Sequence, residues 1–329
     1  MSAPATMRAA CAPLIADAVA GNADVITLGA DGQALFSQVI GGRPDRYVET
    51  GIAETNLVGV AAGLARAGWR PIAGAMAPFL VRRAYEQLRL DISLPGLPAV
   101  FLGVGGGLAY GTLGPSHHVV DDLALMSALP AMDLYCPADA ADAAAVLRHC
   151  LPPERPVYVR LTARQDPPVF AGRDPGDPRA VRLLREPARA HALVLATGRC
   201  VAEAIRAADT LAGRGVRVAV GAVTCLRPFP AAQVRELVAG TPRVVTVAEA
   251  LAQGGLGELT AAAAQGLPAR ITRLAVDERY PPVGEHEELL AFYGIDAAAV
   301  ERAVRDTGTA GTGGAARHDD PRPSEEGVQ

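Results

Sequence analysis

The first half of the chain contains a carboxylate whose surroundings could give it unusual chemistry. Glu54 stands at the start of an apolar helical stretch, Leu57–Ala65. A carboxyl desolvated there would hold its proton near neutral pH and could donate it to a ring nitrogen of a bound heterocycle. The alternative is an acid in a first helical turn, where it satisfies free amides and favours the helix dipole. The residues alone leave both interpretations open.

Two other residues follow runs that read as buried strands. Asp31 comes directly after VITLGA at 25–30, and open α/β sheets place ligand-contacting residues just beyond such strand ends. A turn aspartate beside Gly32 is the alternative. Phe79 follows PIAGAM at 71–76 and Pro78, which marks the start of a helix expected over 79–91. By itself a large apolar residue at this position is most simply part of the core.

A glycine-rich loop follows the strand expected at 99–104. It carries five glycines between positions 105 and 114 and ends in His117 and His118. No phosphate-loop pattern is present. Neighbouring Cys or carboxylate clusters are also missing, so we expect no metal ligands here. The strand expected at 156–164 delivers Arg160 and Arg164 near the same edge.

Strand-like and helix-like stretches alternate along the chain, which predicts α/β domains with mostly parallel sheets covered on both faces. We expect a first domain at 1–165 and a second at 191–306, each with three α/β/α layers. The linker expected at 166–190 is dense in Pro, Gly and charge. Residues 307–329 are poor in apolar side chains and are expected to be disordered.

Composition limits the class of protein. The 329 residues are 50% hydrophobic and 20% charged, with a net charge of -4. Scattered basic residues argue against nucleic acid and anionic membranes as partners. Five widely spaced cysteines without a CxxC pattern fit reduced, mostly buried thiols. Asp17 interrupts the apolar N-terminus, so we expect a short helix there instead of an export signal, and a cytoplasmic protein.

Four stretches in register resemble the transketolase and 1-deoxyxylulose-5-phosphate synthase family: LGADGQALF, GIAETNLVGVAAGLA, APFLVRRAYEQLRLD and GTLGPSHH. The resemblance implies a thiamine diphosphate pyrimidine-binding domain followed by a transketolase C-terminal domain. It implies that Glu54 and His117 are catalytic, with Phe79 stacking on the aminopyrimidine ring. The full cofactor set that it implies is Asp31, Glu54, Phe79 and Arg82, and the substrate set is His117, His118, Arg160 and Arg164.

The family's diphosphate- and metal-binding pattern, Gly-Asp-Gly followed downstream by Asn, is missing; GADG at 29–32 lacks the matching Asn. The resemblance therefore implies the C-terminal subunit of a split transketolase. A separate N-terminal subunit would hold most of the diphosphate and Mg²⁺, in an α2β2 heterotetramer. The assembled enzyme would transfer a two-carbon ketol unit from a ketose, which we expect to be phosphorylated, to an aldehyde or a specialised acceptor.

Two departures from the family leave the substrate open. Leu113 stands where many transketolases have an Asp, and Gly103–Gly106 lacks the His used near a sugar phosphate. The alternatives are a 1-deoxyxylulose-5-phosphate synthase-like subunit, a 2-oxo acid dehydrogenase beta-type subunit and a non-catalytic regulatory half.

Overall fold

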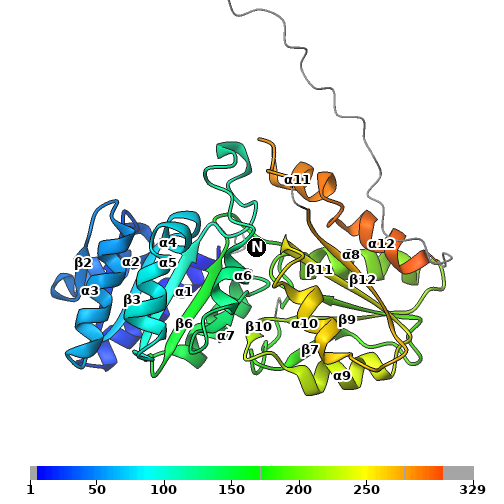
Figure 1. Cartoon of the computed structure of the whole chain (residues 1–329), viewed down its shortest axis with the longest axis horizontal. Coiled ribbons are helices and arrows are strands. Elements are labelled where there is room, and N and C mark those ends of the chain that lie inside the picture. The colour runs from blue at the N-terminus through cyan, green and yellow to red at the C-terminus, as the bar shows by residue number, and fades with distance from the viewer. Residues whose placement is uncertain (1–5, 171, 278, 307–329) are drawn as a thin grey trace, which may run out of the picture.

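The computed structural model describes residues 6–306 except residues 171 and 278, and it contains two α/β units side by side (Figure 1). The first unit is built on a seven-stranded sheet in the order β10-β5-β6-β4-β3-β1-β2. All neighbouring strands pair in parallel except β10, which is antiparallel to β5. The strands are β1 (Val25–Gly29), β2 (Tyr47–Glu49), β3 (Arg70–Met76), β4 (Ala99–Val104), β5 (Asp133–Tyr135), β6 (Pro156–Leu161) and β10 (Cys225–Arg227).

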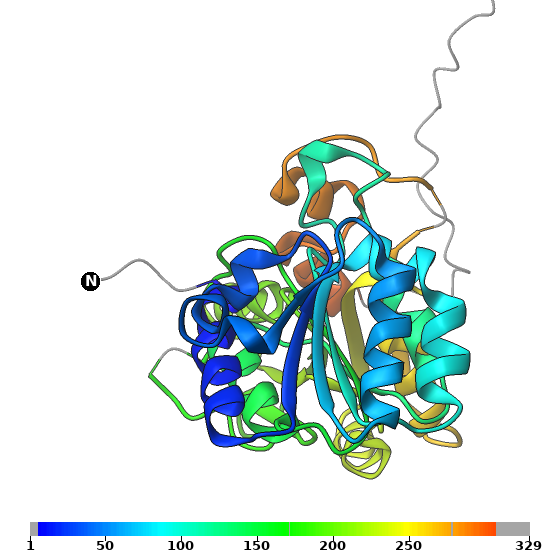
Figure 2. The ribbon, with the colours of Figure 1, turned by 90° about the vertical axis from the view of Figure 1, so that its left-hand side faces the viewer.

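Helices cover both faces of this sheet, because its central strands are apolar on both sides. One face packs against α1 (Met7–Gly21), α2 (Gln33–Gly42) and α7 (Ala140–Cys150). The other face packs against α3 (Glu54–Arg66), α4 (Ala77–Arg83) and α6 (Asp122–Ser127). Figure 2 shows the dark blue α1 and α2 on one side of the strands and the lighter blue and cyan helices on the other. Short 3-10 turns complete the unit: η1 (Pro44–Arg46) and η3 (Gly111–Leu113).

Helix α3 has the boundaries that its sequence predicts. It begins at Glu54, after Gly51 turns the chain with a φ of 67°, and it is followed by Gly68 with a φ of 92°. Its buried face consists of small and branched apolar residues, including Leu57, Val58 and Ala61. The helix therefore holds the carboxylate at its first residue against the carboxyl end of the sheet.

The helix expected over 79–91 is interrupted in the structure. Helix α4 ends at Arg83, and the chain bends at Ala84 (φ -109°, ψ 17°). It resumes as α5 (Tyr85–Gln87) and a π-helical segment, η2 (Leu88–Ser93). Ala84, Leu88 and Ile92 are all buried. The bend and the wider π turn take up more residues per turn than a regular α-helix does, so that these apolar side chains all face the sheet.

The second unit has a five-stranded sheet in the order β12-β11-β8-β9-β7. The strands are β7 (Val181–Arg185), β8 (Ala192–Ala196), β9 (Val218–Val223), β11 (Arg243–Leu251) and β12 (Arg270–Val276). Neighbours are parallel except β7, which pairs antiparallel with β9. Helices α8 (Cys200–Ala212) and α12 (Ala297–Arg305) cover one face, and α9 (Ala231–Ala239) and α10 (Leu256–Ala263) cover the other. Helix α11 (His286–Phe292) follows β12.

These two mostly parallel, helix-covered sheets confirm the predicted fold class. Two details differ from the sequence-based expectation. The segment 166–190, expected to be a linker throughout, contributes edge strand β7, because its backbone pairs with β9. Strand β10 crosses from the second unit to the edge of the first sheet, where Cys225 pairs with Tyr135. The tail expected at 307–329 lies outside the described residues.

Two observations bear on the expected setting of the chain. All five cysteines are free and buried, as the sequence predicts, and burial raises the pKa of the Cys11 thiol to about 12. Within the part of the chain that the structure describes, none of the helices has the length and apolar character needed to span a bilayer.

Candidate functional site

The carboxylate of Glu54 is buried where α3 begins, and its side chain is 4% exposed. Its Oε2 lies 3.2 Å from Nη1 of Arg83, the last residue of α4. The Arg83 side chain is half exposed, so this ion pair reaches the protein surface and does not lie deep in the core. A lone carboxylate at such a place can bind a nitrogen-rich group, and a guanidinium meets that need here.

Phe79 lies beside this ion pair. The guanidinium carbon of Arg83 is 4.1 Å from the centroid of the Phe79 ring, a cation–π geometry. The His117 ring approaches Phe79 edge-on, with 5.3 Å between the centroids and an interplanar angle of 72°. Phe79 is only partly buried. Part of Phe79 is therefore accessible to a ligand, whereas a residue that only packs in the core would be fully buried.

The loop that carries His117 depends on glycine. Gly105 and Gly107 have φ angles of 81° and 68°, which favour glycine. A Cβ on Gly105 would lie 1.9 Å from the ring of Tyr110. The loop therefore packs tightly enough to hold Tyr110 near His117, with 6.3 Å between the ring centroids. Ser116 Oγ lies 2.9 Å from Nδ1 of His117 and helps to fix the imidazole.

A buried ion pair in the second unit anchors this loop. Glu249 Oε1 accepts a hydrogen bond from the Leu108 amide at 2.6 Å and lies 2.6 Å from Nε2 of His286. Burial opposes the charge on Glu249, but His286, Arg160 and the Leu108 amide outweigh it and lower the pKa of Glu249 to about 2. Further along the loop, Gly284 N–H donates to the Gly111 carbonyl at 3.2 Å. Figure 1 shows the loop and α11 together above the two sheets.

Asp31 lies just beyond β1 with a φ of 52°, in the left-handed region. The Glu49 carboxylate holds this conformation, since its Oε1 accepts from the amides of Asp31 and Gly51 at 3.0 and 2.9 Å. Partial burial opposes ionisation of Glu49, but hydrogen bonds from Tyr47 and these amides lower its pKa. Asp31 lines a cavity of about 150 Å³, together with Tyr110.

Arg82 and His118 lie on the other side of α4 and the loop. Arg82 forms an ion pair with Asp121, Nη2 to Oδ1 at 2.8 Å, and donates to the His118 carbonyl at 2.9 Å. The His118 side chain is buried, which lowers the pKa of its imidazole. Arg82 and His118 line a cavity of about 620 Å³ that reaches Tyr280 in the second unit. The structure thus separates Arg82 from the pair formed by Glu54 and Arg83.

Arg160 and Arg164 hold the loop in place. Arg160 is 5% exposed; its Nη2 lies 3.0 Å from Asp122 Oδ1, and its guanidinium donates to the carbonyls of Val119 and Glu249. Arg164 donates to the Ala109 carbonyl at 3.0 Å and pairs with Glu285 at 3.1 Å. Burial and its ionic partner hold the Arg160 guanidinium at the contact between the two units.

Comparison with known proteins decides the family. Residues 3–167 match the family described as "Transketolase, pyrimidine binding domain", and residues 180–300 match "Transketolase, C-terminal domain". The chain belongs to the transketolase family.

Among transketolase relatives, the chain is 33% identical over 272 residues to the 6-deoxy-6-sulfo-D-fructose transketolase subunit SqwH of Clostridium sp. (strain MSTE9), covering 82% of this chain and 83% of that protein. It is 31% identical over 288 residues to an apulose-4-phosphate transketolase subunit of Actinobacillus succinogenes, covering 86% and 92%. A split gene transketolase, solved as an inactive beta4 tetramer, superposes with a TM-score of 0.81 and 31% identity, covering 92% and 97%.

Family membership implies dependence on thiamine diphosphate. The residues at the start of α3 and on α4 fit its aminopyrimidine part. A flat, nitrogen-rich group already lies on Phe79 and binds Glu54 there, in the form of the Arg83 guanidinium. The metal ion that would accompany the diphosphate has no such set. Among residues 6–306, apart from the two positions not described, no three His, Cys, Asp or Glu side chains are grouped to hold a metal ion.

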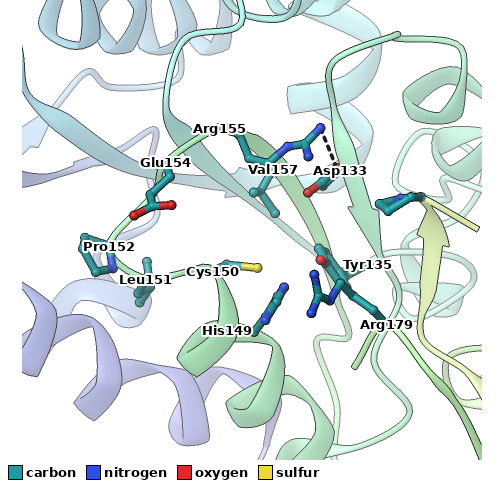
Figure 3. Close-up of a pocket in the computed structure, with 11 residues that line it drawn as sticks. Asp133, Tyr135, His149, Cys150, Leu151, Pro152, Glu154, Arg155, Val157 and Arg179 are labelled. Carbon is teal, nitrogen blue, oxygen red and sulfur yellow. Dashed lines mark ion pairs between the residues drawn. The ribbon is translucent and has the colours of Figure 1, made fainter. Parts of the chain in front are cut away.

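A separate cavity of about 370 Å³ lies at the amino ends of β5 and β6, away from the loop that carries His117. Asp133 and Arg155 form an ion pair in its lining, with 3.1 Å between Oδ1 and Nη2 (Figure 3). Since ligand sites in open α/β sheets lie at the carboxyl ends of the strands, this cavity is not part of the candidate site.

Sequence reasoning did not assign Arg83, Tyr110 or Glu49 to the site. Arg83 was visible only as one of several arginines on the helix expected over 79–91, and nothing in the spacing distinguishes it from Arg82. The available signal for Tyr110 was its position as the sole aromatic residue of a glycine-rich loop.

Proposed function

We propose that this chain is the C-terminal subunit of a split thiamine diphosphate-dependent transketolase. It would transfer a two-carbon ketol unit from a ketose to an aldehyde or a specialised acceptor. The observation that carries the proposal is the convergence of Glu54, Phe79 and His117 at one edge of the first sheet. The sequence also lacks the Gly-Asp-Gly and Asn pattern that the resemblance associates with the diphosphate. The names of the relatives support it, since two of them are transketolase subunits.

Each residue would have one task. Phe79 would support the aminopyrimidine ring, because aromatic rings stack favourably. Glu54 would hold a proton at a ring nitrogen, which a buried carboxyl can do. When bound, the cofactor supplies the carbanion chemistry that breaks and makes the bond next to the ketose carbonyl. His117, braced by Ser116, would hold or accept a proton at a substrate oxygen.

The other residues would shape the site. We propose that Asp31, held by Glu49, borders the cofactor pocket. Arg164 is 40% exposed at the base of the loop, so it remains a candidate for a substrate anion. For Arg82 and Arg160, we propose that they fix the loop and the contact between the units, which is where their hydrogen bonds run. His118 contributes its backbone carbonyl to this network.

We propose that the missing part of the site comes from an N-terminal subunit. That subunit would bind Mg²⁺ and the diphosphate, and two copies of each chain would form an α2β2 assembly. A subunit that binds only the pyrimidine side of the cofactor cannot fix the reactive ring by itself. Binding of the diphosphate by the other subunit would hold the cofactor at both ends, and two linked contacts bind far more tightly than either one alone.

The donor is proposed to be a phosphorylated ketose, and the acceptor is left as an aldehyde class. The name of the apulose-4-phosphate relative supports a phosphorylated substrate. Against it, Leu113 and the stretch Gly103–Gly106 lack the groups that the resemblance associates with substrate hydroxyls and phosphate, which favours a specialised substrate. A second candidate is synthase chemistry, because the chain is 33% identical over 272 residues to the 1-deoxy-D-xylulose-5-phosphate synthase 1 of Geobacter sulfurreducens, of which it spans 41%.

The test is reconstitution. The purified chain should show no ketol transfer alone and should gain it when mixed with an N-terminal transketolase subunit of the same organism, thiamine diphosphate and Mg²⁺. Mass spectrometry of the native complex would report two copies of each chain. Ketol transfer by the single chain would refute the split-enzyme proposal. Release of CO₂ from pyruvate with no transfer from ketoses would favour the synthase alternative.

A further inference from the structure

The guanidinium of Arg83 makes two contacts that the proposed function gives to a cofactor ring. Its central carbon lies 4.1 Å from the centroid of Phe79. Its Nη1 lies 3.2 Å from Oε2 of Glu54, whose side chain is 4% exposed. The stacking surface and the buried acceptor are therefore both engaged by a side chain of the same chain.

The chemistry of the two groups is similar. A guanidinium is planar and delocalised, stacks on aromatic faces and donates to carboxylates through adjacent nitrogens. The edge of a 4-aminopyrimidine likewise carries a ring nitrogen and an amino group on one flat carbon. We propose that Arg83 occupies the pyrimidine position of the cofactor-free chain, and that a pyrimidine ring binds by displacing it. The proposal rests on the proposed function.

The surroundings of Arg83 allow it to leave. Its side chain is half exposed. It is also the last residue of α4, directly before the bend at Ala84, so the guanidinium can move into water without repacking the core. The neighbouring Arg82 is bound to Asp121 and to the His118 carbonyl on the other side of the helix. Arg82 therefore cannot take the place of Arg83 without losing those partners.

Arg83 also stabilises the buried Glu54 carboxylate when no cofactor is bound. An ion pair with a permanently charged guanidinium is formed by the ionised carboxylate, and a buried carboxylate without a partner is costly. When Arg83 leaves, Glu54 must find another hydrogen-bond partner, and the nitrogen-bearing edge of a pyrimidine ring can supply one. Arg83 therefore stabilises the empty site and competes with the ring for it.

Competition lowers the apparent affinity, because only the fraction of molecules with Arg83 displaced can bind the ring. A half-exposed ion pair and a cation–π contact together reduce that fraction by roughly 5- to 30-fold. Removing the guanidinium should raise the affinity for the pyrimidine by the same factor.

The experiment uses the full chain and two probes, 4-amino-5-hydroxymethyl-2-methylpyrimidine and thiamine diphosphate with Mg²⁺, with binding followed by calorimetry and by ligand-observed NMR. Arg83→Ala should bind both probes roughly 5- to 30-fold more tightly than the wild type. Arg89→Ala is the matched control, since Arg89 is 51% exposed and paired with Glu86 at 3.0 Å; its affinity should equal that of the wild type. Unchanged or weaker binding by Arg83→Ala would overturn the proposal.

A second measurement follows the Arg83 side chain directly. In the chain labelled with ¹⁵N-arginine, the side-chain signal of Arg83 should show a ring-current shift that disappears in Phe79→Leu and on addition of the pyrimidine. If the pyrimidine binds while the Arg83 signal stays in place, displacement is refuted and the proposed function stands. If the reconstituted complex binds no thiamine diphosphate at all, the proposed function fails and the displacement proposal fails with it.

Discussion

Replacing Asp166 by asparagine should stabilise the protein increasingly as the pH rises. Asp166 follows β6 and is 6% exposed, and its carboxylate accepts a hydrogen bond from the Thr162 hydroxyl. Burial raises the pKa of Asp166 from 3.8 to about 6, against the opposing effects of Thr162 and Arg199. The folded protein thus holds this proton more tightly than the unfolded chain does.

The sign and size of the effect follow from that shift. Because the folded pKa is raised, the favourable contribution of Asp166 is complete below pH 3.8 and is lost as the pH rises through about 6. A shift of roughly 2 pKa units corresponds to about 3 kcal/mol of unfolding free energy. About 2 kcal/mol of this should develop between pH 4.5 and pH 8. Asparagine keeps the acceptor for Thr162 and has no charge to bury.

The assay is urea unfolding of both proteins at intervals from pH 4.5 to 8. The difference in unfolding free energy between Asp166→Asn and the wild type should grow by about 2 kcal/mol in favour of the variant over this range. Asp174→Asn is the control, since Asp174 is exposed and its replacement should leave the pH profile unchanged. Parallel profiles for Asp166→Asn and the wild type would refute the reasoning.

Two further expectations concern the site and its anchor. Glu54→Gln should assemble normally and lower the exchange rate of the cofactor's thiazolium proton by roughly 10²- to 10⁴-fold in the reconstituted complex, as measured by NMR; near wild-type exchange would favour the helix-dipole role instead. Glu249→Gln should destabilise the fold by about 3 kcal/mol at neutral pH, because the fall in the pKa of Glu249 from 4.5 to about 2 corresponds to roughly that much stabilisation of its carboxylate. Since the pKa of Glu249 is lowered from 4.5 to about 2, the stability that Glu249 contributes should persist above pH 4.5 and disappear as the pH falls towards 2. A constant difference between variant and wild type over that range would contradict this.

The sequence by itself determined the elements and their order. Apolar runs without alternation predict strands buried on both faces, and β1, β3 and β4 are such strands. The spacing of small residues after Glu54 predicts a helix that begins with a carboxylate, and α3 does so. These features are local, because the hydrophobic periodicity of an element and the residues that begin and end it lie within a short stretch of sequence.

Only the tertiary structure decided which side chains share the site. Arg82 and Arg83 are adjacent, yet successive residues on a helix point roughly 100° apart, so one pairs with Asp121 and the other with Glu54. The burial of Arg160 against Asp122 and the crossing of β10 to the first sheet depend on residues distant in the chain. Such contacts arise from tertiary packing, within the first unit for Arg160 and Asp122 and between the two units for β10. No local pattern in the sequence specifies which partner a charged side chain will contact.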